Sequence, residues 1–129
     1  MKLRIRDNSV RLRLTRGEVD ILRDVELVAG RTGFPGGHEF RYVVESSPDS
    51  AKPEASFADN AVTVRLPEST VLAWANSEQV SIVAEQLLDN GESLAILVEK
   101  DFACLAPREG EDDSDAFAHP EADNDDVTC

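Results

Sequence analysis

The chain has 129 residues with 26 Asp or Glu against 13 Lys or Arg, which gives a formal net charge of −13 and allows one ordinary domain. This charge excludes general affinity for nucleic acid or anionic membranes, and no apolar run is long enough for a membrane helix. Two cysteines are too few for a disulfide framework and the N-terminus shows no secretory signal, so we expect a cytoplasmic, bacterial-type protein with reduced thiols.

The first predicted element is a hairpin formed by residues 2–6 (KLRIR) and 10–14 (VRLRL). Both stretches alternate with a period of two, which predicts strands, and Asp7-Asn8 suits a two-residue turn between them. We expect the aliphatic side chains of this hairpin to be buried together on one face. The basic side chains then share the other face, and they are Lys2, Arg4, Arg6, Arg11 and Arg13.

The next predicted elements are a short helix and a pair of strands. Thr15 and Glu18 have the spacing of a capping box, which indicates the start of a helix. Residues 25–34 and 38–45 then read as two strands, because a Pro-Gly-Gly turn separates two stretches of strand-like composition.

Two more hairpins and a second helix complete the predicted elements. Residues 54–66 read as a hairpin that turns at an Asp-Asn pair, and residues 67–77 read as a short helix. Residues 79–102 hold an Asn-Gly pair between two apolar runs, which is the strongest short hairpin signal. We expect this last hairpin to be central in its sheet.

This reading gives about eight strands and two short helices, with mostly antiparallel pairing because hairpins join the strands. We expect an α+β domain over residues 1–106, built as one strongly bent sheet or a small barrel covered by the helices. Residues 107–129 contain nine Asp or Glu and one Arg, which predicts an acidic tail. Residues 1–24 and 55–77 share a strand–strand–helix layout, but their sequences do not indicate a duplication.

The basic face of the first hairpin poses an electrostatic question. A two-residue turn places Arg4 opposite Arg11 and Lys2 opposite Arg13, whereas a four-residue loop opposes Arg6 to Arg11 and Arg4 to Arg13. Either register opposes like charges, which destabilises a sheet by up to ~1 kcal/mol per pair. Solvent, salt and neighbouring acids can offset the repulsion, the candidate acids being Glu39, Glu45, Glu85 and Glu99. The acidic tail or an external anion can also do so, since Arg binds carboxylate and phosphate.

Other chemistry has weaker candidates. Cys104, His119 and Cys129 could ligate a metal such as zinc, but their spacings fit no standard zinc motif. His38 is expected to be exposed, and no nucleophile constellation or phosphate-binding glycine loop is visible. We therefore assign no catalytic residue and no cofactor. The charged run at residues 99–101 is expected to form local ion pairs with the first hairpin.

One stretch, residues 97–117 (LVEKDFACLAPREGEDDSDAF), carries a resemblance together with the opening hairpin and the segment LPESTVLAWANSEQVSI. The chain resembles, over nearly its whole length, a family of small and functionally uncharacterised bacterial proteins. The shared Glu-Lys-Asp-Phe-x-Cys-Leu motif is formed here by Glu99, Lys100, Asp101, Phe102, Cys104 and Leu105. The resemblance implies a shared fold and no activity. The opening LRIR is also similar to strands of the triphosphate tunnel enzymes, although their Glu-x-Glu-x-Lys motif is absent.

Two functions remain as hypotheses, and the oligomeric state stays open. The first is a non-enzymatic binding protein whose basic hairpin contacts an anionic small molecule or an acidic protein segment, its own tail included. The second is a metal-dependent phosphate-ester hydrolase of the polyphosphate type that uses the basic face for substrate. An enzyme needs two or more carboxylates that converge with the arginines in a deep cavity, whereas a binding protein needs only an exposed surface.

Overall fold

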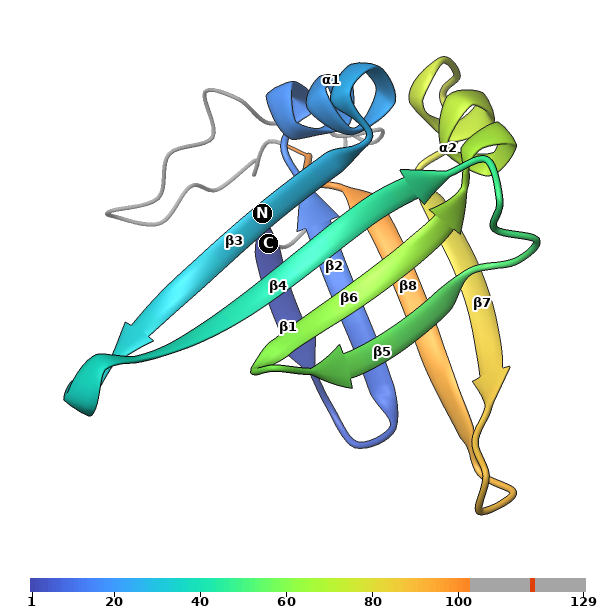
Figure 1. Ribbon diagram of the computed structural model, residues 1–129. Helices are drawn as coiled ribbons and strands as arrows, with labels where there is room; N and C mark the ends of the chain where they lie inside the picture. Colours follow the sequence, from blue (N-terminus) through green and yellow to red (C-terminus); the bar gives the residue numbers. More distant parts are fainter. Residues whose placement is uncertain (103–116, 118–129) are drawn as a thin grey trace, which may run out of the picture.

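The structure is a computed structural model that describes residues 1–102 and residue 117. Its strands form two four-stranded sheets, here called sheet A and sheet B (Figure 1). Sheet A has the order β1 (Lys2–Ile5), β2 (Ser9–Leu14), β8 (Ser93–Lys100) and β7 (Ser81–Leu87). Sheet B has the order β3 (Leu27–Phe34), β4 (His38–Ser47), β6 (Ala61–Pro67) and β5 (Glu54–Ala58).

Two helices and one short 3-10 segment connect the strands: α1 (Arg16–Val25), α2 (Glu68–Ala75) and η1 (Pro35–Gly37). The predicted capping box of α1 is confirmed, because Glu18 N–H donates to Thr15 Oγ1 at 3.3 Å and Thr15 N–H donates to Glu18 Oε1 at 3.0 Å. Both helices lie at the same end of the two sheets and pack against each other (Figure 1).

The α+β class, the eight strands and the two helices agree with the prediction, but the single bent sheet or small barrel is wrong. The two sheets stay separate, and in each sheet one parallel pair joins two antiparallel hairpins. These parallel pairs are β2 with β8 and β4 with β6. The last hairpin is also not central as a whole, since β8 is interior and β7 is an edge strand. Hairpin signals are local, so they do not say which hairpins pair with each other.

A single hydrophobic core lies between the sheets and extends beneath the helices. Its fully buried side chains come from both sheets and both helices, and the largest are Trp74, Leu12, Leu14, Leu22, Leu66 and Ile96. Trp74 also satisfies its polar atom, because Nε1–H donates to the Val80 carbonyl at 2.9 Å. Buried tryptophans usually find such a partner, so its place in the core follows ordinary packing rules.

The chain folds as two halves with the same element order, β-β-α-β-β. Each sheet takes the first hairpin of one half and the second hairpin of the other half. Residues 7–14 (DNSVRLRL) and 59–66 (DNAVTVRL) occupy equivalent places in the two halves. Each segment runs from the turn of the first hairpin of its half into an interior strand of a sheet. The layout shared by residues 1–24 and 55–77 is therefore a structural repeat, although a duplication was not predicted from their sequences.

Candidate anion-binding surface

The basic face of the first hairpin is formed as predicted, on the outer side of sheet A. β1 and β2 are joined by the two-residue turn, and backbone hydrogen bonds of 3.2 and 3.1 Å link Arg6 with Ser9. This register places Arg4 directly opposite Arg11, which excludes the alternative with a four-residue loop. The short turn thus fixes two guanidinium groups across from each other.

The opposite face of this hairpin is buried less completely than expected. Val10, Leu12 and Leu14 on β2 are buried in the core. Leu3 on β1 is half-buried, but Ile5 is 55% exposed. Since β1 is an edge strand and Ile5 ends it, its side chain lies beyond the packed part of the core.

Glu99 on β8 neutralises part of the basic face. It lies beside Arg13 in the parallel pairing of β2 with β8, and its Oε1 accepts the Nε–H of Arg11 at 2.6 Å and of Arg13 at 2.5 Å. The Glu99 side chain is 10% exposed, so water screens these contacts only in part. At the same end of the strands, Lys2 Nζ lies 3.3 Å from Asp101 Oδ2. Three of the five predicted basic residues therefore have an acidic partner on β8 or directly after it.

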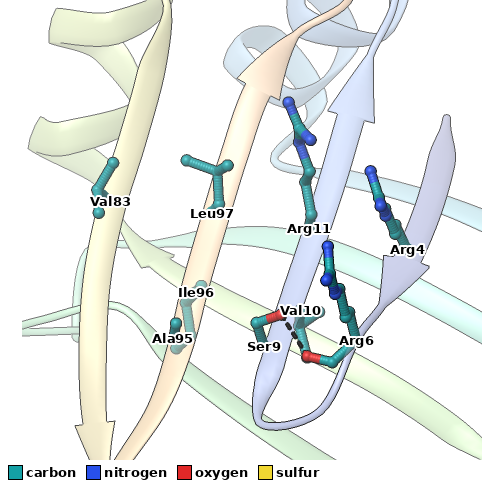
Figure 2. Close-up of a pocket in the computed structure, with 9 residues that line it drawn as sticks. All are labelled: Arg4, Arg6, Ser9, Val10, Arg11, Val83, Ala95, Ile96 and Leu97. Atoms are coloured by element: carbon teal, nitrogen blue, oxygen red, sulfur yellow. Dashed lines mark hydrogen bonds between the residues drawn. The ribbon is translucent and has the colours of Figure 1, made fainter.

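Arg4 and Arg6 have no acidic partner among residues 1–102 and 117. With Arg11, they lie along one side of an open hollow of about 360 Å³ on the outer face of sheet A (Figure 2). Val83 and Leu97 line its other side, and Val83 is 73% exposed. The hollow thus places two uncompensated guanidinium groups opposite an apolar wall.

The repeat shows which ion pair belongs to the framework of the fold. Arg65 and Glu45 occupy in sheet B the places that Arg13 and Glu99 occupy in sheet A. Arg65 Nε donates to Glu45 Oε1 at 2.8 Å, so the same cross-strand pair forms in both halves. Because the pair recurs in sheet B, away from the hollow, we attribute it to sheet structure rather than to ligand binding.

The arginines of the hollow have no such counterpart. The places of Arg4 and Arg11 in sheet A are held in sheet B by Ser56 and Thr63, which also lie directly opposite each other. The same framework is therefore built with uncharged side chains at this row. The paired positive charge in sheet A is a feature that the fold itself does not require.

The remaining acids named in the sequence analysis do not reach the basic face. Glu39 Oε2 lies 3.4 Å from Arg31 Nη1, and Glu45 contacts Arg65, both on sheet B. Glu85 is exposed on β7 and forms no ion pair within the described residues. Within the described residues, the acid that contacts these arginines is Glu99, which the parallel pairing of β2 with β8 places beside Arg13. Local sequence patterns do not predict this pairing.

Lys100 lies between Glu99 and Asp101 in the sequence, but its side chain points to the opposite side of sheet A. Its side chain is buried at the helix-bearing end, where Nζ donates to the Ser77 carbonyl at 2.7 Å and lies 5.7 Å from the Trp74 ring centroid. Burial lowers the pKa of the Lys100 ammonium, and the negative charge of Glu78 partly opposes this shift. Local ion pairing with the hairpin is thus confirmed for Glu99 and Asp101, but it is wrong for Lys100.

The metal candidates Cys104, His119 and Cys129 lie outside the described residues, so their ligand role remains a prediction. Within residues 1–102 and 117, no group of three or more His, Cys, Asp or Glu side chains is close enough to hold a metal ion. His38 is exposed at the start of β4, as expected. Neither helix of the described part is long and apolar enough to cross a membrane.

These features define a class of small α+β protein, in which two four-stranded sheets enclose one core and one outer sheet face is basic. The chain belongs to a family of unknown function (DUF7009), whose family model matches residues 1–121. The expected membership of an uncharacterised family is thereby confirmed, whereas the bacterial origin and the Glu-Lys-Asp-Phe-x-Cys-Leu motif remain predictions. Comparisons with curated proteins and with solved structures found no match.

Proposed function

We propose that the protein is a non-enzymatic binding domain that takes an acidic protein segment on the outer face of sheet A. The observation that carries this proposal is the hollow in which Arg4 and Arg6, without acidic partners in the described chain, face an apolar wall. Guanidinium groups bind carboxylates with two parallel hydrogen bonds. Val83 and Leu97 add apolar surface, so a ligand with both an anionic and an apolar group fits this site better than a bare anion. An anionic small molecule with an apolar part has the same chemistry.

The negative net charge of the chain does not prevent such binding. Charges in salt solution are screened over ~8 Å at physiological ionic strength, so nearby guanidinium groups dominate the field at the hollow. The charge of −13 instead disfavours ligands that cover large areas, such as nucleic acid or a membrane surface. We therefore propose a short anionic segment as the ligand. We also propose that the protein acts in the bacterial cytoplasm.

A metal-dependent phosphate-ester hydrolase is the second candidate. The observation that favours it is that Glu99 and Asp101 share the outer face with the arginines. Both carboxylates, however, are engaged by basic side chains, and the hollow is open rather than deep. Phosphate release from tripolyphosphate in the presence of Mg²⁺ or Mn²⁺ tests this candidate, and the binding proposal expects none above background.

The proposed site can be located with a short acidic peptide. The ¹⁵N-labelled full-length protein is titrated with the synthetic peptide DDLDD and, separately, with the uncharged peptide NNLNN. We expect DDLDD to shift amide resonances around Arg4, Arg6, Ser9, Ala95 and Leu97, and NNLNN to leave them unchanged. Shifts confined to sheet B, or equal effects of both peptides, would contradict the proposal.

A further inference from the structure

A second feature lies at the helix-bearing end of sheet A, where Phe117 packs against the domain. Its ring makes an edge contact with the Phe102 ring, with centroids 5.7 Å apart and an interplanar angle of 60°. The backbone takes part as well, because Phe117 N–H donates to the Asp101 carbonyl at 2.7 Å and a parallel bridge joins residues 102 and 117. Residues 103–116 separate these partners in the sequence, so tertiary structure brings them together.

Two cations face the Phe117 ring. Arg16 Cζ lies 5.4 Å from its centroid and Lys100 Nζ lies 5.3 Å from it, both within the roughly 6 Å range of a cation–π contact. Arg16 is exposed at the start of α1, whereas Lys100 is only 5% exposed and also contacts the Trp74 ring. The electron-rich face of an aromatic ring is the group that this pair of cations attracts.

The contacts around Phe117 together describe a recognition site. Asp101 offers a backbone carbonyl to an extended segment, Phe102 offers an aromatic ring, and the two cations select an aromatic side chain. Positive charge beside the ring also favours acidic neighbours in the bound segment. The chain itself has this chemistry, since residues 111–121 read EDDSDAFAHPE around Phe117.

We propose that the end of β8 is a binding site for an aromatic residue within an extended acidic segment of a partner protein. Phe117 occupies the site within the chain and competes with the partner. Phe117 is only half-buried, and among the described residues its backbone contact is the hydrogen bond to Asp101, so a competing segment that offers the same N–H and an aromatic ring can replace it. A tethered group acts at an effective concentration in the roughly millimolar range, so Phe117 sets the affinity that a partner must exceed. This inference does not depend on the function proposed for Arg4 and Arg6.

The test uses the full-length chain and a fluorescent peptide with the sequence EDDSDAFAHPE. We expect the peptide to bind the Phe117→Ala variant about tenfold or more tightly than it binds the wild type, because the tethered competitor is gone. A peptide with Ala in place of its Phe should bind that variant about tenfold more weakly than the intact peptide. Phe34→Ala, which removes an exposed ring at the end of β3, is the matched control and should behave as the wild type.

Further variants separate this site from the anion-binding surface. In the Phe117→Ala background, Arg16→Gln should lower the affinity ratio of the intact peptide to the Ala peptide several-fold. Arg4→Gln with Arg6→Gln should leave that ratio unchanged, because the anion-binding surface contacts the acidic residues that both peptides share. If Trp74 fluorescence shows that Phe117→Ala does not fold, Phe117→Leu replaces it, because leucine retains an apolar side chain without a ring face. The same affinity order is then expected. Absence of binding to the folded variant, equal binding to variant and wild type, or equal binding of both peptides would overturn the proposal.

Discussion

Arg13 and Glu99 lie side by side in the parallel pairing of β2 with β8, and Arg13 Nε donates to Glu99 Oε1 at 2.5 Å. The same oxygen accepts Arg11 Nε–H at 2.6 Å, so one carboxylate serves two arginines of the basic face. Arg11 also lies opposite Arg4, which has no acidic partner in the described chain. Glu99 is therefore the point at which the stability of sheet A and the charge of its outer face are linked.

Replacing Glu99 with Gln should destabilise the protein. The side chain keeps its size but loses the charge that two guanidinium groups share, and hydrogen bonds to charged groups contribute roughly 1.5–3 kcal/mol. We expect the free energy of unfolding to fall by about 1–3 kcal/mol in urea titrations. Glu39→Gln is the matched control, since the exposed pair with Arg31 at 3.4 Å should contribute less than ~1 kcal/mol. Equal effects of both substitutions would show that Glu99 has no special role.

The same Glu99→Gln variant should bind anions more tightly. Loss of the carboxylate leaves Arg11 free to join Arg4 at the hollow, and it removes a negative charge that repels the ligand. We expect the affinity for DDLDD to rise roughly three- to tenfold, an effect that shrinks as salt increases. An unchanged or lower affinity at low salt would contradict the placement of the ligand beside Arg11.

Gly30 should resist substitution while Gly33 on the same strand should not. A Cβ at Gly30 would lie 2.6 Å from Cζ and 2.8 Å from Oη of Tyr42, its neighbour across β3 and β4. Gly33 has no atom within 4 Å of such a Cβ. We expect Gly30→Ala to lower the free energy of unfolding by about 1–3 kcal/mol through overpacking, and hence to lower the melting temperature. Gly33→Ala should change the melting temperature little or raise it. Similar melting temperatures for the two variants would show that the Tyr42 ring moves aside freely.

The buried Lys100 should make stability depend on pH. Burial lowers its pKa below the ordinary 10.5, so the unfolded chain binds more protons at this residue than the folded chain in the interval between the two values. The contribution of Lys100 to stability therefore rises with pH across that interval. It is lowest when the buried ammonium is fully charged. We expect the unfolding free energy of the wild type relative to Lys100→Met to increase from neutral pH toward pH 10.5. A relative stability that stays constant or falls would contradict the burial of the ammonium.

Local patterns predicted the elements that short-range physics determines. The Asp7-Asn8 turn sets the register of the first hairpin, which in turn places Arg4 opposite Arg11. The capping pattern at Thr15 likewise located the start of α1. In both cases residues near each other in the sequence decide the geometry, so the sequence contains the whole signal.

Other features depended on contacts between distant segments. Glu99 was one of four candidate acids, and only the parallel pairing of β2 with β8 selects it. The contact of Phe117 with the end of β8 has no local signal either. The repeat was different, because the shared Asp-Asn-x-Val-x-x-Arg-Leu pattern at residues 7–14 and 59–66 was present in the sequence. The inward direction of the Lys100 side chain was predictable as well, because successive side chains of a strand point to opposite faces and Lys100 directly follows Glu99.

Isothermal titration calorimetry with the peptide DDLDD tests the anion-binding surface most directly. The double variant Arg4→Gln and Arg6→Gln is compared with Arg31→Gln and Arg41→Gln, which removes the same charge from a directly opposed pair on sheet B. We expect the first variant to lose about tenfold or more in affinity, since two charge-assisted hydrogen bonds are lost, and the control to stay within about twofold of the wild type. Equal losses in the two variants, or full affinity in the first, would contradict the account.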